Sequence, residues 1–431
     1  MLLFPSIVFL DLYLYENIID INFNSTHKNS LIFAIFYALV LIWFYGRKYN
    51  LNINIYSLCF FLILNVYILL KIVFETDGID FLYNFYLSTT SGFMMFYCLG
   101  VIYRSCYALF TLQAKLKKSK FLFLFILYFI FFSITTYNVF KEYSGALRTD
   151  ILLLEGIEAR YQRIGSFLNL RFFIFCFLSI IISKYIFVRK NVKTFAFNLT
   201  LTILAFFLYI FTILIAQFVG SNNCVVTATF TFLFFVLFLN SNIFGRLFDF
   251  FNESFFFSNF KLCLVIVIIS VPTFSFLSLT IQSLGIDPTY FRILGYGRDG
   301  VIDSFSARID LLANFNQHFA YSPILGHLRV HSMLTGEGTY CHSFILSVLT
   351  HLGLLGGFII SLFVLSSVRA NTLHVGTSYN CHNVSINYTI EFSKRFLLIL
   401  FIISSFFTFY TFTILWFVFG FSYPFFAFNK S

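Results

Sequence analysis

The sequence predicts an all-α polytopic integral membrane protein with eleven or twelve transmembrane helices and one large polar loop that contains short helices. Three observations lead to this prediction. Of the 431 residues, 59% are hydrophobic and only 11% are charged, whereas soluble domains carry about 25% charged residues. The mean hydropathy is +0.88. Apolar runs of a length that crosses a bilayer, about 20 residues, recur along the chain.

The apolar runs give the predicted spans. They are residues 2–20, 31–46, 52–74, 84–103, 121–139, 166–188, 194–219, 224–244, 262–282, 342–367 and 396–427. Asp11 and Glu16 interrupt the first run, which makes it the weakest span. The last run suits one tilted helix or a short hairpin broken near Gly420 and Pro424, and twelve spans are favoured. Most of the 68 phenylalanines are expected to face lipid, because they are too many for interfacial aromatic belts.

Basic residues gather on alternate connections between the predicted spans. These connections include residues 47–48, 104–120 and 189–193. Because positively charged loops stay in the cytoplasm, the charge-balanced connections 140–165 and 283–341 are expected on the opposite, outward side.

This orientation divides the chain into three predicted parts. Residues 1–282 form the N-terminal transmembrane helices with the smaller outward loop 140–165, residues 283–341 form the large outward loop, and residues 342–431 form the C-terminal helices. A connection as long as 283–341 is usually functional or disordered. Its helical pattern and aromatic residues favour function, so we interpret it as the catalytic loop.

The composition also excludes several classes of function. The net charge is +10, but the cations lie mainly in short connections rather than on a soluble domain, so no nucleic-acid partner is expected. The eight cysteines are scattered without a C-x-x-C pair, which argues against a zinc ribbon or a disulfide framework. His327 and His331 have the i, i+4 spacing of metal ligands, but the glutamate of H-E-x-x-H is missing and Arg329 between them opposes a cation. We expect no metal site and no cofactor.

Within the large loop, Ser306–Phe319 has the pattern of an amphipathic helix. Its apolar residues recur at steps of three to four, Asp303 or Ser304 is suited to cap its start, and Ser322–Pro323 ends it. Such a helix would lie along the membrane surface with Arg308 on its first turn. The simpler interpretation is an amphipathic tether without a chemical role.

His342 follows a glycine-containing stretch at the predicted start of the next helix. The positive end of the helix dipole attracts anions and keeps an imidazole neutral, so His342 is suited to accept a proton. Glu337 lies between two glycines and is an alternative base. His351 lies nine residues further on, at the opposite face of the helix, and is expected to be structural.

The smaller outward loop supplies a second group of arginines. Arg160 and Arg163 share a helix face and suit a bidentate grip on phosphate, although neighbouring acids offer the plainer explanation that the charges cancel. Arg171 lies six residues inside an apolar span. It either snorkels to the interface or faces the protein interior as a functional candidate. Asp11 and Lys71 are similar charges within spans. Together, outward arginines and a neutral imidazole suit an anionic amphiphile such as a lipid-linked pyrophosphate.

Four motifs in order along the chain resemble the O-antigen polymerase and ligase family. They are an arginine helix, a P-x-x-G loop, an H-[NS]-x-x-L helix start and a G-x-x-G segment, at Ser306–Leu312, Pro323–His327, His342–Leu346 and Gly353–Gly356. Arg163–Asn169 is similar to the segment that follows the family's other outward loop. One feature departs from the family: many members carry a Ser-Arg-Gly-like turn between two middle spans, where this chain has Gly220–Asn223.

The resemblance implies a metal-independent glycosyltransferase of the Gram-negative inner membrane, with its active loops in the periplasm. A polymerase joins undecaprenyl-pyrophosphate-linked oligosaccharide repeat units into the O-antigen polysaccharide of lipopolysaccharide. Lipid-linked glycans are both donor and acceptor, and a chain-length regulator protein is an implied partner. A ligase instead transfers the polymer to lipid A–core. We favour the polymerase over the ligase because of the stretch at residues 336–343 and the Phe-rich, low-charge spans. A lipid-linked oligosaccharide flippase is less favoured, because such a protein should have two similar halves and charges spread through many spans, whereas this chain has no internal repeat and few charges within its spans.

The resemblance also implies roles for individual residues. His342 accepts a proton from the attacking sugar hydroxyl or orients it, and Arg308 with Arg160 and Arg163 stabilises the charge on the departing pyrophosphate. Glu337 remains the alternative base. The other residues expected to bind the substrate are Arg171, His327 and Arg329. Arg160, Arg163 or Arg171 is expected to compensate for the arginine missing from the Gly220–Asn223 turn.

Overall fold

The computed structural model confirms the all-α fold class. It describes residues 3–19, 39–40, 43, 50–75, 91–112, 118–143, 158–186, 192–219, 221–239, 283, 315–316, 319–327, 343–370, 381–407 and 413–429. In this part of the chain nearly all residues are helical, and two strands of four residues each complete the secondary structure. The protein is an all-α polytopic membrane protein.

Four of the described helices are long and apolar enough to cross a membrane. They include Ser119–Tyr143, Ile164–Ser183, Phe195–Val219 and Phe344–Ser366. Shorter apolar helices coincide with further predicted spans. Most residues of the predicted spans 31–46 and 262–282 lie outside the described residues, so the total of eleven or twelve stays a prediction.

The described elements belong to two compact units, each assembled from separate stretches of the chain. Unit 1 consists of Met1–Tyr37, Gln113–Asp303 and Cys381–Ile399, and unit 2 consists of Ala38–Leu112, Ser304–Asn380 and Leu400–Ser431. The three parts predicted from the sequence, residues 1–282, 283–341 and 342–431, were defined by the side of the membrane on which the loops lie. The two units are defined by packing, so the three-part division stays a prediction.

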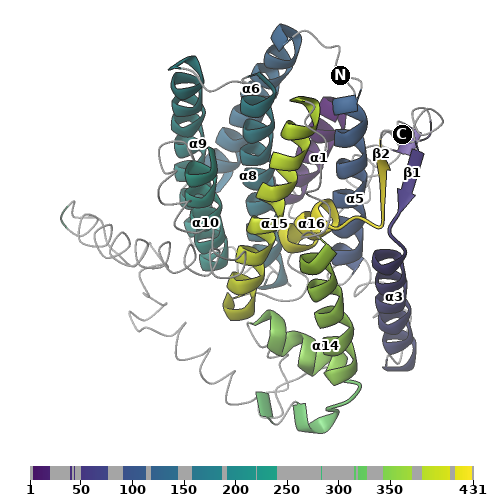
Figure 1. Ribbon diagram of the computed structural model, residues 1–431. Helices are drawn as coiled ribbons and strands as arrows, with labels where there is room; N and C mark the ends of the chain where they lie inside the picture. The colour runs from purple at the N-terminus through teal and green to yellow at the C-terminus, as the bar shows by residue number, and fades with distance from the viewer. Residues whose placement is uncertain are drawn as a thin grey trace. The chain divides into compact units, whose positions relative to one another are not determined.

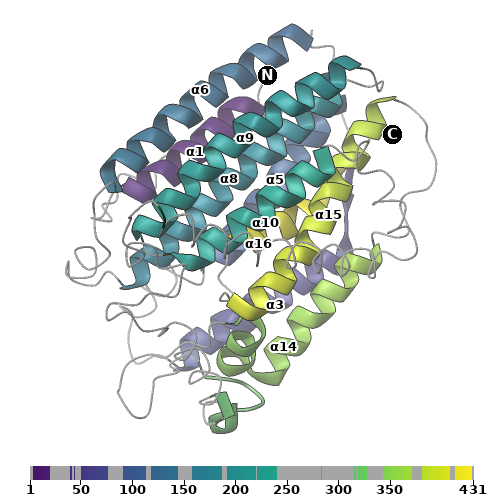
Figure 2. The same cartoon turned by 90° about the vertical axis from the view of Figure 1, so that its left-hand side faces the viewer.

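Unit 1 is a helical bundle built around α8 (Glu158–Ile186). This helix contacts α1 (Leu3–Ile19), α6 (Lys118–Tyr143), α9 (Val192–Val219) and α10 (Asn222–Leu239), and the five run side by side in Figures 1 and 2. Within the protein, 94% of the apolar window of α8 is buried, against 33% for α6 and α9. The central helix is therefore α8, while α6 and α9 present apolar faces outward, as helices next to lipid do.

Phenylalanine side chains fill the space between the helices of unit 1. Phe173 of α8 stacks on Phe396 of α15 (Cys381–Phe407) with ring centroids 4.8 Å apart, and Phe234 of α10 packs on Phe392 at 5.1 Å. In the described part of the chain, more phenylalanines are buried than exposed. This differs from the expectation that most face lipid, because ring packing between helices uses them.

Unit 2 contains two closely packed helix pairs. The first pair is α3 (Ile55–Glu75) with α14 (Phe344–Ala370), and the second is α5 (Ser91–Leu112) with α16 (Thr413–Ser422). The second pair is so close that a Cβ atom added at Gly100 of α5 would overlap the Phe417 carbonyl oxygen. Glycine permits such backbone-to-backbone contact between apolar helices.

A short antiparallel strand pair joins the C-terminal segment to the start of α3. Strand β1 (Asn50–Ile53) pairs with β2 (Phe426–Asn429), and the Asn54 N–H donates to the Phe425 carbonyl at 2.9 Å. On the adjoining helices, the Tyr97 hydroxyl donates to the Tyr423 carbonyl at 2.9 Å. These bonds fix the end of α16 against α3 and α5.

The structure corrects the interpretation of the last predicted span. Residues 396–427 contain the end of α15, which stops at Phe407, and all of α16. Gly420 lies inside α16 rather than at a break, and it packs so closely on α5 that a Cβ atom there would overlap the Tyr97 carbonyl oxygen. Pro424 does follow the end of the helix, as expected for a residue without an N–H group.

We predict that Gly420→Ala destabilises unit 2, because its methyl group would force α16 away from the α5 backbone. Overpacking of this kind costs about 1–3 kcal/mol. The measurement is the thermal stability of the protein by fluorescence-detected gel filtration in detergent. Gly357→Ala is the matched control, since the nearest atom to its Cβ is a flexible Leu349 side-chain carbon at 3.1 Å. Equal stability of the two variants would contradict the close α5–α16 contact.

Candidate functional site

Helix α8 carries all three arginines that the sequence assigns to the smaller outward loop and the span after it. The helix begins at Glu158, eight residues before the predicted span, so Arg160 and Arg163 lie in its first turns. The side chains of these two arginines lie outside the described residues. Arg171 lies about 12 Å further along the axis than Arg163, at 1.5 Å per residue.

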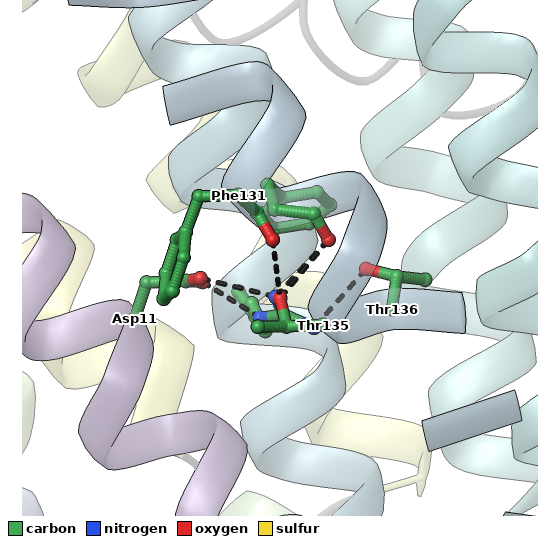
Figure 3. A network of polar contacts seen from close by, with 6 residues as sticks. Asp11, Phe131, Thr135 and Thr136 are labelled. Atoms are coloured by element: carbon green, nitrogen blue, oxygen red, sulfur yellow. Dashed lines mark hydrogen bonds and ion pairs between the residues drawn. The ribbon is translucent and has the colours of Figure 1, made fainter. Parts of the chain in front are cut away.

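Arg171 points into unit 1 and forms a bidentate ion pair with Asp11 of α1. Its Nε donates to Asp11 Oδ1 at 2.7 Å and its Nη2 to Oδ2 at 3.0 Å. Nη1 donates to Thr136 Oγ1 at 3.1 Å, and Nη2 also reaches the Phe132 carbonyl at 3.2 Å and the Thr135 hydroxyl. Figure 3 shows Asp11, Thr135 and Thr136 converging on this point. The network joins α1, α6 and α8.

The burial of this ion pair decides between the two interpretations of Arg171. Its side chain is 2% exposed and that of Asp11 is 0% exposed, so Arg171 does not snorkel to the interface. The guanidinium lies 4.3 Å from the centroid of the Phe132 ring, which adds a cation–π contact. Arg171 would have to give up the carboxylate of Asp11 to bind a phosphate. The role of Arg171 in substrate binding therefore stays a prediction, and the Asp11 carboxylate would compete with the substrate for its guanidinium group.

The same ion pair explains how the first predicted span becomes a helix despite its acid. A lone carboxylate inside an apolar bundle is costly, but Arg171 neutralises the charge of Asp11 and accounts for both of its oxygens. Helix α1 thus runs unbroken from Leu3 to Ile19.

The Ser221 turn, which carries no arginine, packs against the first part of α8. A Cβ atom added at Gly165 would overlap Ser221 Oγ, and Cys224 Sγ donates to Asn169 Oδ1 at 3.4 Å. Ser221 itself accepts from the Cys224 N–H at 3.3 Å and so caps the start of α10. The turn without an arginine therefore lies beside the helix that carries Arg163, two residues from Gly165.

In unit 2, the P-x-x-G turn closes a break in α14. Gly353 has φ 64° and ψ −170°, which interrupts the helix. The N–H of Leu354 donates to the Pro323 carbonyl at 2.9 Å, and the N–H of Leu355 donates to the Ile324 carbonyl at 3.1 Å. The turn thus supplies the acceptors that the broken helix lacks, as an interrupted helix in an apolar environment requires.

The two glycines of this contact leave no room for a side chain. Gly326 has φ 70° and Gly353 has φ 64°, both in the left-handed region that glycine favours. A Cβ atom at Gly326 would overlap the backbone nitrogen of Gly353, and one at Gly353 would overlap the Ile324 carbonyl oxygen. The glycines of the P-x-x-G and G-x-x-G motifs therefore meet backbone to backbone.

His327 is held at the end of this turn. Its N–H donates to the Thr350 carbonyl of α14 at 2.8 Å, and its ring meets Tyr321 edge-on with centroids 5.1 Å apart. The side chain is half-buried, so part of the imidazole is accessible for hydrogen bonding to a sugar hydroxyl or a phosphate oxygen. Tyr321 is the last helical residue before Ser322–Pro323, which confirms the predicted helix end.

The remaining predicted site residues are not among those described. Arg308, Arg329, Glu337 and His342 lie outside the described residues, as does most of the predicted helix Ser306–Phe319. The described residues near the end of that helix are helical, and the rings of Phe315 and Phe319 stack at 5.4 Å. The described part of the chain has no group of three or more His, Cys, Asp or Glu side chains that could hold a metal ion.

Sequence reasoning missed three contacts at these places. It noted Asp11 without identifying its partner, it treated Gly353 as part of an unbroken span, and it placed no element beside the Ser221 turn. The Asp11–Arg171 contact could have been suggested by the sequence, because the two residues carry opposite charges within two predicted spans. A comparison of the chain with protein-family models gives no match, and neither does a comparison with curated proteins.

We predict that Asp11→Asn and Arg171→Gln each destabilise the protein by about 3–5 kcal/mol, because either change leaves a buried charge without its partner. The Asp11→Asn/Arg171→Gln double variant should recover part of the loss. The measurement is the thermal unfolding midpoint of purified protein in detergent. Glu142→Gln on α6, whose side chain is exposed, is the matched control and should leave the midpoint unchanged. A wild-type midpoint for Asp11→Asn would refute the ion pair as a structural contact.

Proposed function

We propose that this protein is an O-antigen polymerase of the bacterial inner membrane. It joins undecaprenyl-pyrophosphate-linked oligosaccharide repeat units into lipopolysaccharide O-antigen at the periplasmic face. The apolar helices that span the membrane support the bilayer as its environment. The sugar-transfer activity, the lipid-linked substrates and the outward orientation of the loops belong to the proposal.

The contact between Pro323–His327 and Gly353–Gly356 carries the proposal. The two segments were grouped only because their patterns resemble two motifs of one family. In the structure they share two backbone hydrogen bonds, of 2.9 and 3.1 Å, and two left-handed glycines that touch. A motif pair that packs together has a physical reason to occur together. The contact between the two motifs therefore supports the family resemblance in addition to the similarity of their sequences.

The position of the arginines on α8 supports a site for pyrophosphate. Arg160 and Arg163 lie in the first turns of a helix that enters the membrane bundle, where lipid-linked phosphate would meet them. Guanidinium groups bind phosphate oxygens in pairs. The Ser221 turn lies beside Gly165, so an arginine on α8 is near the place where many family members carry theirs. Arg163 is the best placed to compensate.

The proposed reaction is a single glycosyl transfer. A hydroxyl oxygen of the acceptor repeat unit forms the new bond to the anomeric carbon of the donor chain, and the bond from that carbon to the pyrophosphate oxygen breaks. His342 accepts the hydroxyl proton, with Glu337 as the alternative base. Arg308, Arg160 and Arg163 stabilise the charge on the leaving undecaprenyl pyrophosphate. His327 and Arg329 bind sugar or phosphate.

A deletion strain separates this function from the two alternatives. Without a polymerase, lipopolysaccharide carries a single repeat unit, and this is the result we expect from gel analysis. Rough core with accumulated lipid-linked polymer would indicate a ligase. Repeat units stranded on the cytoplasmic leaflet would indicate a flippase. Either of these two outcomes would refute the proposed function.

We predict that His342→Ala abolishes polymer ladders and that Arg308→Lys weakens them by about tenfold or more. The lysine keeps the charge but loses the two-pronged guanidinium. The measurement is the ladder on a lipopolysaccharide gel, normalised to the amount of protein in the membrane. His27→Ala and Arg47→Lys, outside the family motifs and outside the large loop, are the controls and should keep wild-type ladders. Normal ladders for His342→Ala would remove this residue from the mechanism.

A further inference from the structure

Two side chains of α3 contact the turn that ends in His327. The Tyr67 hydroxyl lies 2.9 Å from the Leu325 carbonyl oxygen and 2.8 Å from the Leu352 carbonyl oxygen, so its one proton bridges the turn and the broken helix. One helical turn further on, Lys71 Nζ donates to the Gly326 carbonyl at 2.6 Å. Both contacts lie within unit 2.

Lys71 occupies an unusual place for a cation. Its residue is 6% exposed, while α3 presents Val66, Leu70, Val73 and Phe74 as exposed apolar side chains. A charged group on an apolar membrane helix is costly, and its retention points to a specific partner or function. The Gly326 carbonyl is one such partner. It belongs to the peptide group that leads into His327, so Lys71 fixes the plane from which the imidazole extends.

Tyr67, from the same helix, contacts the neighbouring carbonyl of the turn and the broken helix. The carbonyl of Leu325 belongs to the turn, and that of Leu352 precedes the Gly353 break, so one phenol holds both segments. Backbone hydrogen bonds already join the turn to α14. Tyr67 and Lys71 add a third element, α3, which leaves the turn fixed from two helices.

The predicted membrane orientation agrees with this arrangement. The basic pair at residues 47–48 is expected in the cytoplasm, so α3 would run outward and Lys71 would lie near its outward end. The loop 283–341 is expected on the same side. The contact between Lys71 and Gly326 brings together two segments that charge patterning alone assigns to one face of the membrane.

We propose that Tyr67 and Lys71 are positioning residues that hold the Pro323–His327 turn against the break in α14 and thereby place His327 for substrate binding. This inference rests on the proposed function for the identity of the substrate. The contact itself does not depend on that function. Preorganisation of this kind is what a binding residue at the end of a turn requires.

The contact is tested first by residue-resolved hydrogen exchange on the full-length protein in nanodiscs. Tyr67→Phe and Lys71→Met should each speed exchange at the Gly326 and His327 amides by about tenfold, the effect of losing one stabilising hydrogen bond on local opening. Lys71→Arg keeps a donor and should stay near the wild-type rate. Tyr56→Phe, on an exposed part of α3, and Lys120→Met, at an exposed position of α6, are the controls. Unchanged exchange in both Tyr67→Phe and Lys71→Met overturns the proposal.

The positioning role is tested by the rate of polymer formation from lipid-linked repeat units with the same proteins. Because His327 is assigned to binding, Tyr67→Phe and Lys71→Met should raise KM by about fivefold while kcat changes by less than about twofold, and Lys71→Arg should restore KM. A fall in kcat at constant KM, which follows a loss of folded protein, overturns the positioning role. Inactive wild-type protein refutes the proposed function, and the exchange result then still decides whether the contact exists.

Discussion

No water is present in the core of a bilayer, so every polar group of this protein that enters the apolar bundle needs a partner inside the protein. The structure meets this requirement in two places that organise the rest. In unit 1, Asp11 and Arg171 neutralise each other and join α1, α6 and α8. In unit 2, the break at Gly353 would leave backbone groups of α14 without partners, and the Pro323–His327 turn supplies them.

These two solutions have different consequences for function. The ion pair gives Arg171 a partner inside the bundle, whereas Arg160 and Arg163 lie in the first turns of α8, where we propose that they meet an anionic substrate. The closed break in α14 fixes the part of the large loop that contains His327. A broken membrane helix is tolerated where protein surrounds it. Here the break gives a polar loop a rigid attachment, which is what a catalytic or binding segment needs.

Much of the fold follows from the sequence because apolar length and helix-breaking residues are local signals. Helices α6, α8 and α9 match predicted spans to within a few residues at most ends, and Ser322–Pro323 ends a helix as its letters indicate. Contacts over long distances carry no such signal. Asp11 and Arg171 are 160 positions apart, and their opposite charges within predicted spans were the one hint of a pairing that only the fold identifies. Local composition also led to two wrong boundaries. Gly353 lies in a continuous apolar run that predicts an unbroken helix, but the helix is interrupted there. The polar residues after Cys381 did not predict that α15 begins at this point.

The candidate site divides in the same way. The candidate histidines and arginines and the glycine motifs could be identified in the sequence, and the family resemblance suggested a role for each. The roles of Tyr67 and Lys71 were not visible, because a tyrosine and a lysine in an apolar helix have no local pattern that names their acceptors. Only the folded backbone shows that the Leu325 and Gly326 carbonyls face them.

The central claim is that the Pro323–His327 turn closes the break in α14, and cysteine cross-linking tests it most directly. The eight native cysteines are first replaced by alanine or serine. Ile324→Cys and Leu355→Cys then place thiols on two exposed positions whose backbones are hydrogen-bonded at 3.1 Å, within the reach of a disulfide. We expect this pair to cross-link readily under mild oxidation in membranes. Pairing Ile324→Cys with Phe358→Cys, one turn further along α14, should give a much lower yield. Equal yields for the two pairs, or none for the first, would contradict the account.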